Sequence, residues 1–420
     1  MRKKYVIFAV IAFLTGISVF GACNRSSNSD DTVAVINEKD TGTYQNGLEK
    51  DEAKDSEKDN SSNSTVTATV YNTIEPTATP VKELKIVAVG DILLGRGVGM
   101  RLKNGNKDYT YPFLEVRDIL KKGDVIFCNL EESITASTHS LTGIKEGGKY
   151  VLKNDVEAIE GLKYAGFNLM NLANNHILDY YEKGLFDTME ILDKNGIKYA
   201  GAGKNLEEAR KPAIMEVKGM KVGMLAYTDM AEVVYKGNPN YKFAAGEDKP
   251  GVAPRPLKFD DSIKKDIEQV RDKVDILIVS LHWGVEESFV VLPEQREFAY
   301  NLIDNGVDVI LGHHPHQFQG IEIYKGKPIF YSLGNFIFDQ NDPENQEAFI
   351  VTLDYKGTEL VGVEALPVRT IGKIQVVPQK GDEAKSILER EKNLCDKLDT
   401  KCFIKDDKLY FELKNGNDLR

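Results

Sequence analysis

Residues 307–316 read Val-Asp-Val-Ile-Leu-Gly-His-His-Pro-His, an apolar run followed directly by three histidines. The chain has six histidines in 420 residues, so half of them stand within four positions. Pro315 favours an extended backbone at His314, and residues two apart in an extended segment point to the same side. His314 and His316 are therefore predicted to face one centre, whereas the ordinary alternative is a histidine cluster on the surface.

Further apolar runs of strand length occur along the chain, with amphipathic stretches of helix length between them. The strand-like runs cover 85–90, 124–128, 167–172, 275–281, 307–311 and 328–333, and the helix-like stretches cover 156–165, 185–194, 259–273 and 294–304. This alternation predicts an α/β fold with buried strands. In such folds, ligands bind beyond the carboxyl ends of the strands.

The predicted strands end in side chains that divalent metals bind. Asp91 follows the first run, Glu131 the second, and His282 the fourth. Each also has an ordinary explanation, because an aspartate caps helices, a glutamate is often solvated, and a single histidine is often a hydrogen-bonded core residue. Five strand ends with such groups in one chain favour a shared metal site.

Asn175 and His176 are neighbours at the end of the third run, so their side chains are expected to diverge and to have different tasks. An asparagine amide oxygen can bind a metal while the adjacent imidazole moves a proton. His139 lies in a loop rich in serine, threonine and glycine, and we expect it at the surface.

The N-terminus has the layout of a bacterial lipoprotein signal. A basic start precedes the apolar stretch 5–20, and small residues stand before Cys23. We therefore expect residues 1–22 to be a signal peptide and Cys23 to carry lipid; the alternative is an uncleaved membrane anchor, for which the apolar run is short. Residues 23–83 are polar and acidic, which predicts a disordered tether. The chain is then extracytoplasmic and anchored by lipid to the cell membrane.

Residues 84–420 are predicted to form the folded part of the chain, with C-terminal strands and a helix. The chain has a net charge of −11, which argues against nucleic acid as a partner. Cys128 lies in an apolar run and is expected to be a small buried side chain. Cys395 and Cys402 are close in sequence, and their spacing leaves open whether they form a disulfide.

Six motifs occur in a specific order along the chain. They are Gly90-Asp91-Ile-Leu-Leu-Gly-Arg96, Asn129-Leu-Glu131, Leu172-Ala-Asn-Asn-His176-Ile-Leu-Asp179, His282-Trp-Gly284, Gly312-His-His-Pro-His316 and Tyr331-Ser-Leu-Gly-Asn335-Phe. Together they resemble the CapA family of bacterial poly-γ-glutamate capsule synthesis proteins, from about residue 84 to 370. The resemblance implies a metallophosphatase-like four-layer α/β/β/α sandwich.

The resemblance also implies roles for individual residues. It makes His176 the catalytic histidine and His313 the dispensable member of its cluster. The implied metal ligands are Asp91, Glu131 (as the bridging carboxylate), Asn175, His282, His314 and His316. One position departs from the wider pattern, because Leu93 stands where a histidine ligand is expected. Arg96 is a candidate for holding an anionic substrate, and the alternative is a structural arginine.

These expectations lead to two functional hypotheses. In the first, the protein is a hydrolase or transferase that uses one or two divalent metals (manganese, iron or zinc), and it acts in the synthesis or export of poly-γ-glutamate or a related cell-envelope polymer. In the second, the fold binds and assembles the polymer without turnover. Both hypotheses make an anionic polymer, the membrane and a membrane-bound polymer synthetase complex the expected partners.

Overall fold

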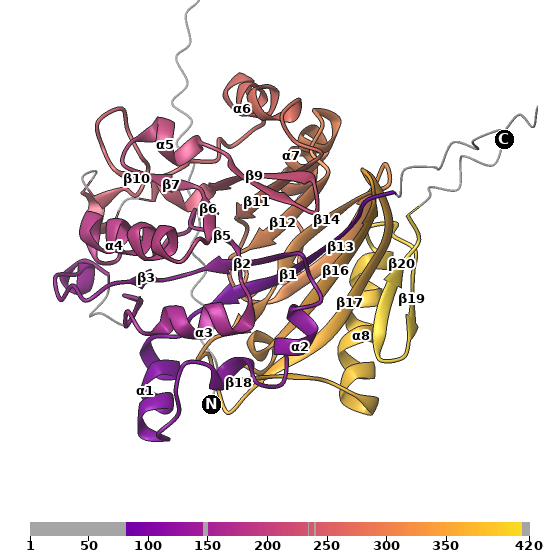
Figure 1. Cartoon of the computed structure of the whole chain (residues 1–420), viewed down its shortest axis with the longest axis horizontal. Helices are drawn as coiled ribbons and strands as arrows, with labels where there is room; N and C mark the ends of the chain where they lie inside the picture. Colours follow the sequence, from indigo (N-terminus) through magenta and orange to yellow (C-terminus); the bar gives the residue numbers. More distant parts are fainter. Residues whose placement is uncertain (1–80, 146–149, 234, 239–240, 414–420) are drawn as a thin grey trace, which may run out of the picture. The chain divides into compact units, whose positions relative to one another are not determined.

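The structure is a computed structural model, and it describes residues 81–145, 150–233, 235–238 and 241–413 (Figure 1). The predicted signal peptide, the lipidation candidate Cys23 and residues 23–80 of the predicted tether lie outside these ranges. None of the helices in the described ranges is long and apolar enough to cross a membrane.

Two large β-sheets form the centre of the domain. The first sheet has the order β19-β20-β17-β16-β1-β2-β5-β6, with β15 beside β1 and β18 beside β17. Its strands are β1 (Glu83–Ile92), β2 (Val125–Leu130), β5 (Leu169–Asn171), β6 (Lys198–Ala200), β15 (Asn335–Ile337), β16 (Glu347–Lys356), β17 (Glu359–Ile371), β18 (Gln375–Pro378), β19 (Cys402–Lys405) and β20 (Lys408–Phe411).

The second sheet has the order β13-β14-β12-β11-β9-β8. Its strands are β8 (Ala213–Val217), β9 (Met220–Thr228), β11 (Ile276–His282), β12 (Val309–His313), β13 (Phe318–Tyr324) and β14 (Lys327–Leu333). Two short pairs join β3 (Ser133–Ile134) to β4 (Lys153–Asn154) and β7 (Ala202–Gly203) to β10 (Gly251–Val252).

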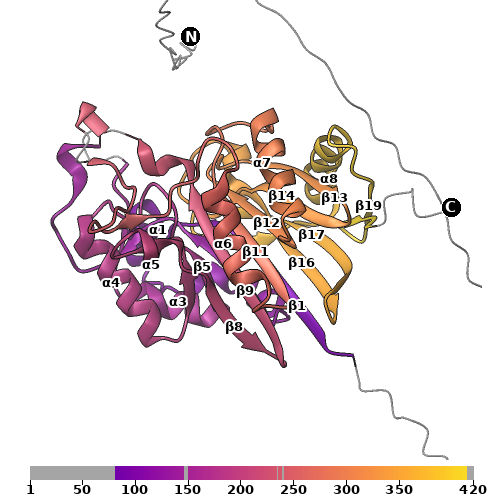
Figure 2. The same ribbon diagram turned by 90° about the horizontal axis from the view of Figure 1, so that it is seen from above.

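Helices cover the outer faces of the two sheets, except for α8 (Gly381–Asp396), whose apolar side chains pack in the core between the sheets beside β13. The others are α1 (Arg96–Asn104), α2 (Arg117–Leu120), α3 (Ala158–Ala165), α4 (Tyr181–Lys194), α5 (Leu206–Arg210), α6 (Asp261–Arg271) and α7 (Pro293–Asp304). The four predicted helices correspond to α3, α4, α6 and α7. Figure 2 shows α6 and α7 beside the second sheet, on the side away from α3 and α4.

Three apolar cores separate the layers. Side chains such as Phe127 from the first sheet and Leu311 from the second pack together between the sheets. Leu162 of α3 packs in a core on the outer side of the first sheet, and Phe298 of α7 packs in one on the outer side of the second. This arrangement confirms the predicted four-layer α/β/β/α sandwich.

Parallel pairing brings the carboxyl ends of several strands to the same region. In the first sheet, β1, β2 and β5 are parallel, and in the second, β9, β11, β12 and β14 are parallel. β2, β11 and β12 are buried along their whole length, so their sequences are continuous apolar runs.

A close backbone contact fixes the end of β1. A Cβ atom on Gly90 would lie 1.8 Å from the carbonyl oxygen of Gly334, so only glycine fits there. The next residue, Asp91, donates its backbone N–H to that same carbonyl at 3.0 Å. Gly334 itself has a φ of 73°, a conformation that favours glycine.

The C-terminal helix α8 packs against β13 and contains a buried acid. Cys395 and Cys402 are free thiols in the structure, and both are buried, as is Cys128.

The Glu391 carboxylate accepts the backbone N–H of Ile321 at 3.0 Å. Burial raises its pKa to about 8, although the hydrogen bonds from Cys395 and Ile321 act in the opposite direction.

Glu391 should therefore make stability depend on pH. Its pKa is higher in the folded than in the unfolded protein, so the folded state binds the proton more tightly and loses stability as pH rises from about 4.5 to about 8. We expect Glu391→Gln to flatten the fall in the unfolding temperature across this range. Thermal unfolding of both proteins at pH 5 and pH 8 measures this; an equal fall in both would contradict the assignment.

Candidate metal centre

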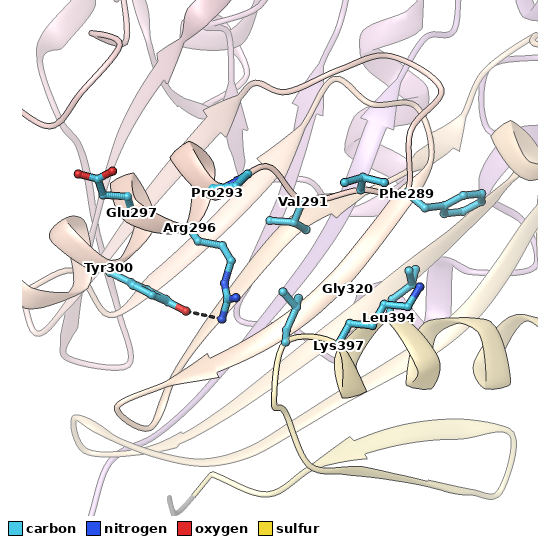
Figure 3. Close-up of a pocket in the computed structure, with 11 residues that line it drawn as sticks. Phe289, Val291, Pro293, Arg296, Glu297, Tyr300, Gly320, Leu394 and Lys397 are labelled. Carbon is cyan, nitrogen blue, oxygen red and sulfur yellow. Dashed lines mark hydrogen bonds between the residues drawn. The ribbon is translucent and has the colours of Figure 1, made fainter.

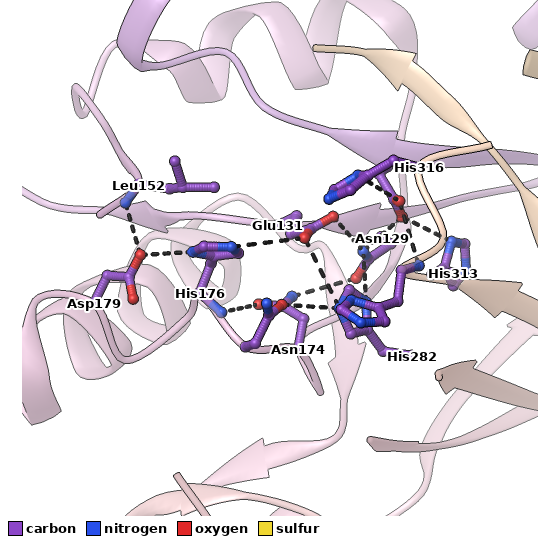
Figure 4. A network of polar contacts seen from close by, with 12 residues as sticks. Asn129, Glu131, Leu152, Asn174, His176, Asp179, His282, His313 and His316 are labelled. Carbon is purple, nitrogen blue, oxygen red and sulfur yellow. Dashed lines mark hydrogen bonds and ion pairs between the residues drawn. The ribbon is translucent and has the colours of Figure 1, made fainter. Parts of the chain in front are cut away.

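The six predicted metal ligands meet where the two sheets end. Each lies at or just beyond the carboxyl end of a strand, and each is at most 7% exposed. Asp91 is in β1, Glu131 follows β2, Asn175 follows β5, His282 ends β11, and His314 and His316 follow β12. Figure 4 shows much of this polar network.

The ligand atoms form two groups that share one carboxylate. The first group contains Glu131, His282 and His314, and the second contains Asp91, Glu131 and His316. Within each group the ligand atoms lie within 4.8 Å of one another, a spacing that could hold a metal ion. Glu131 is common to both groups, so it is placed to bridge two metals.

Buried donors hold Asp91 in place from both sheets. Asn129 Nδ2 donates to Asp91 Oδ1 at 2.8 Å, and His313 Nδ1 lies 3.1 Å from the same oxygen. Burial opposes the charged form of Asp91, but the hydrogen bond and charge of His313 outweigh it and lower the pKa of Asp91. His313, predicted to be the dispensable member of its cluster, is fully buried and contacts this candidate ligand.

Glu131 lies in the middle of the centre with an unpaired oxygen. Its Oε1 atom is buried and has no hydrogen-bond partner, and it lies 3.8 Å from His282 Nε2. Burial and the nearby charge of Asp91 raise the pKa of Glu131 well above its usual value. A cation would offset both effects, so this site fits a divalent metal.

The histidines of the first group are suited to metal binding. His282 Nε2 lies 2.9 Å from Asn175 Oδ1, and the His282 and His314 rings are 4.7 Å apart. His314 Nδ1 is buried and without a hydrogen-bond partner. Burial and the charge of His316 lower the pKa of His314 to about 3, and burial lowers that of His282 well below its usual value. Both rings are therefore neutral at pH 7, which is the form that binds metals.

The segment around Pro315 is not extended, so that prediction was wrong. His314 has a φ of 97° and His316 a φ of 60°, which makes the segment a turn. Proline disfavours the right-handed helical conformation in the preceding residue but leaves other regions open. His314 and His316 still join the centre, because each belongs to one of the two groups around Glu131.

His176 belongs to neither group of potential ligands. Its Nδ1 atom donates to Asp179 Oδ2 at 2.7 Å, and its Nε2 atom lies 3.9 Å from Glu131 Oε1. The imidazole therefore lies beside the centre with Nε2 facing it, as Figure 4 shows. Burial and the charge of Lys145 lower the pKa of His176 to about 4, so the ring is neutral at pH 7.

The second group has an apolar boundary. Leu93 is fully buried in a cluster with Leu152 and Phe338, and the Phe338 ring lies 5.0 Å from the His316 ring. His316 Nδ1 is hydrogen-bonded to Asn335 Oδ1 at 2.9 Å. Leu93, two residues after Asp91, thus supplies an apolar side chain and no metal ligand.

The Phe338 side chain lies between Arg96 and His316 of the candidate centre. Arg96 forms an ion pair with Asp339, and its guanidinium lies 5.6 Å from the centre of the Phe338 ring. Phe338 in turn packs on His316. His139, by contrast, is exposed and stacks on Tyr181, as expected for a surface residue.

A separate groove lies between α7, β13 and α8 (Figure 3). It has a volume of about 600 Å³ and is lined largely by apolar side chains, with Arg296 hydrogen-bonded to Tyr300 at one side. Its lining shares no residue with the metal centre.

Comparison with known proteins gives the family. The model of the bacterial capsule synthesis protein family PGA_cap matches residues 85–340. The capsule biosynthesis protein CapA of Bacillus anthracis is 32% identical over 69% of this chain and 68% of its own length. The chain belongs to the PGA_cap family.

Two further comparisons extend this result. The PGA biosynthesis protein CapA of Bacillus subtilis is 31% identical over 79% of this chain and 83% of its own length. A 5'-nucleotidase from Candida albicans aligns with 77% of this chain and 59% of its own at 10% identity and a TM-score of 0.37, which is too low to support an argument.

Sequence reasoning missed four residues around the centre, all within the PGA_cap match. Asn129 and Asp179 stand inside the quoted motifs, two residues before Glu131 and three after His176, so their spacing was a usable signal. His313 was seen but given no task. Lys145 lies in a glycine-containing loop about thirty residues before His176, and nothing in the sequence pattern connects the two.

We expect His314→Ala to lower the metal content of the purified protein, because it removes one ligand from the first group. Elemental analysis after dialysis against manganese or zinc measures the content. His139→Ala is the matched control and should leave it unchanged. A wild-type protein without metal, even after manganese and zinc are added, would contradict the metal site.

Proposed function

We propose that this protein is a divalent-metal-dependent hydrolase or transferase that acts on poly-γ-glutamate or a related cell-envelope polymer during its synthesis or export. The observation that carries the proposal is the pair of ligand groups sharing Glu131, with His176 beside them but outside both. Imidazole and carboxylate ligands together suit one or two ions of manganese, iron or zinc better than calcium.

The residues would divide the work as follows. Glu131, His282, His314 and Asn175 would hold one ion, and Asp91, Glu131 and His316 would hold the other. A bound ion supplies a Lewis acid and an activated water. Asp179 fixes the His176 ring through Nδ1, which leaves Nε2 as the atom that exchanges a proton at the centre. In this role His176 would first accept a proton at Nε2 from the attacking water and would then pass that proton to the leaving group.

The polymer is inferred from the relatives. Two of them are named for capsule biosynthesis and PGA biosynthesis, and these names are what suggest an anionic polymer as the partner. Arg96 is a candidate for holding a carboxylate of such a polymer near the Phe338 side of the centre. The lipid anchor would keep the domain outside the cytoplasm and close to a membrane-bound polymer synthetase complex.

A second candidate function is binding and assembly of the polymer without turnover. The observation that favours it is Leu93, because the second group of ligands is bounded by an apolar cluster and is thereby depleted. The two functions differ in what they require of His176, since only catalysis needs a group that moves a proton.

His176→Ala should lower polymer production, by about 100- to 10,000-fold in the catalysed step, because it removes the proton-transfer group. Metal content should stay nearly intact, since His176 is in neither ligand group, whereas Asn175→Ala should loosen a metal. Polymer yield from cells carrying each variant, turnover of a γ-glutamyl or phosphoester model substrate, and elemental analysis are the measurements. Normal yield with normal metal in His176→Ala would refute catalysis and favour the binding function.

Cys23→Ala should abolish lipid attachment, because the proposed anchor is formed on that thiol. Metabolic labelling with a fatty acid, followed by intact-mass measurement of wild type and variant, tests this. Equal labelling of the two proteins would rule out Cys23 as the anchor.

A further inference from the structure

Lys145 is an ammonium group buried next to the candidate centre. Its side chain is 4% exposed, and Nζ lies 2.5 Å from Asp179 Oδ1 and 2.7 Å from the backbone oxygen of Asn175. The same nitrogen is 3.4 Å from His176 Nδ1. Lys145 Nζ thus contacts the candidate ligand Asn175 and the proton-transfer residue His176. It also contacts the Asp179 carboxylate, which lies between Lys145 and His176.

Burying this charge is costly and needs a reason. On one side, the faces of the Tyr235 and Phe243 rings lie 5.0 and 5.1 Å from Nζ and attract the cation weakly. An ammonium in such a place is retained only when its partners offset the loss of water. Here the offsetting partners are Asp179 and the Asn175 carbonyl, and both belong to the segment that carries the site.

The two oxygens of the Asp179 carboxylate accept hydrogen bonds from different donors. Oδ1 accepts from Lys145, while Oδ2 accepts from His176 Nδ1 at 2.7 Å and from the backbone N–H of Leu152 at 2.7 Å. With these donors in place, the carboxylate cannot rotate freely. The proton on His176 is therefore held at Nδ1, and Nε2 is directed toward Glu131.

The second contact of Lys145 acts on Asn175. Nζ holds the Asn175 carbonyl, and the side chain of the same residue places its amide oxygen 2.9 Å from His282 Nε2. Without the ammonium, the Asn175 carbonyl and Asp179 Oδ1 would each lose a donor in a buried place, which costs free energy. A neutral side chain of similar length could fill the space but would not supply these hydrogen bonds.

We propose that Lys145 is a positioning residue for His176. It fixes Asp179, and through it the tautomer and direction of the His176 imidazole, and it holds the Asn175 backbone at the same time. This inference rests on the proposed function where it concerns turnover, but its geometric part, the state of the His176 ring, can be measured without any substrate.

The first test is spectroscopic. In the full-length protein loaded with zinc and labelled with 15N-histidine, the His176 signals are identified by their loss in His176→Ala. We expect the wild-type ring to be in the Nδ1–H tautomer, and Lys145→Met to replace this single state by a mixture. Lys145→Arg, which keeps a charged donor, should retain more of the wild-type state. An unchanged His176 signal in Lys145→Met would overturn the proposal.

The second test is functional and uses a double variant. Lys145→Met should lower polymer yield by about 10- to 100-fold, the usual loss when a supporting hydrogen-bond partner is removed. Lys145→Met should cost less in a His176→Ala background than in the wild type, because Lys145 acts largely through that ring and only separately on the Asn175 carbonyl. Lys153→Met is the matched control, since Lys153 Nζ donates instead to the Ser137 carbonyl, at 3.1 Å.

The outcomes separate the two proposals. A loss that adds fully to that of His176→Ala, or an equal loss in Lys153→Met, would overturn the positioning role. If His176→Ala leaves polymer yield unchanged while Lys145→Met still alters the His176 tautomer, the catalytic function falls and the positioning role stands. Lys145→Arg guards against misfolding, because it keeps a charged donor; a Lys145→Arg protein that folds and yet behaves like Lys145→Met would count against the proposal.

Discussion

The structure of the centre depends on two buried carboxylates that lie close together in a place without water. Asp91 and Glu131 repel one another, and burial penalises the charge of each. The protein compensates Asp91 with donors from Asn129 and His313, but it leaves one oxygen of Glu131 unpaired. A buried carboxylate oxygen without a hydrogen-bond partner is typical of a cation-binding site, because a bound cation favours the charged form of the carboxylate.

This constraint explains why two sheets are needed. Asp91 and Glu131 come from the first sheet, and the histidines that surround them come from the second. Contact between the two sets requires the end of β1 to approach the turn after β14, which Gly90 and Gly334 permit. His313 then reaches across from β12 to Asp91. The apolar core between the sheets thus sets how far apart the strand ends lie, and the short segments just beyond those ends place the candidate ligands.

Much of the fold could be predicted, because strands buried on both faces are continuous apolar runs that any reader can find. Two of the strands that were missed lack this signal, whereas β16 has it and was overlooked. β17 alternates between buried and partly exposed residues along much of its length, and β9 is interrupted by Gly223, which weakens its strand pattern. Strand-end ligands were also predictable, since parallel strands end at one edge of a sheet. The turn at His314 and His316 was not, because local preference at Pro315 is decided by the packing of the whole segment.

The residues around the ligands were harder to find for a different reason. Asp179 is three residues from His176, so its contact is local, whereas Lys145 reaches the same group from a distant loop and depends on tertiary packing. The order of the motifs identified the family and suggested which residues could be metal ligands. The partner that holds Asp179 appears only when the atoms are placed.

The two ligand groups, here called the two halves of the centre, differ in whether their buried atoms have hydrogen-bond partners. Glu131 Oε1, which has no hydrogen-bond partner, belongs to both halves, but the half with His282 and His314 has a further unpaired buried atom, His314 Nδ1. In the other half, Asp91 accepts hydrogen bonds from Asn129 and His313, and His316 Nδ1 is bonded to Asn335. Because an unpaired buried group costs free energy and a paired one does not, an ion gains more by entering the first half. The apolar cluster at Leu93 adds no ligand to the second half, so the packing and the hydrogen bonds point to the same inequality.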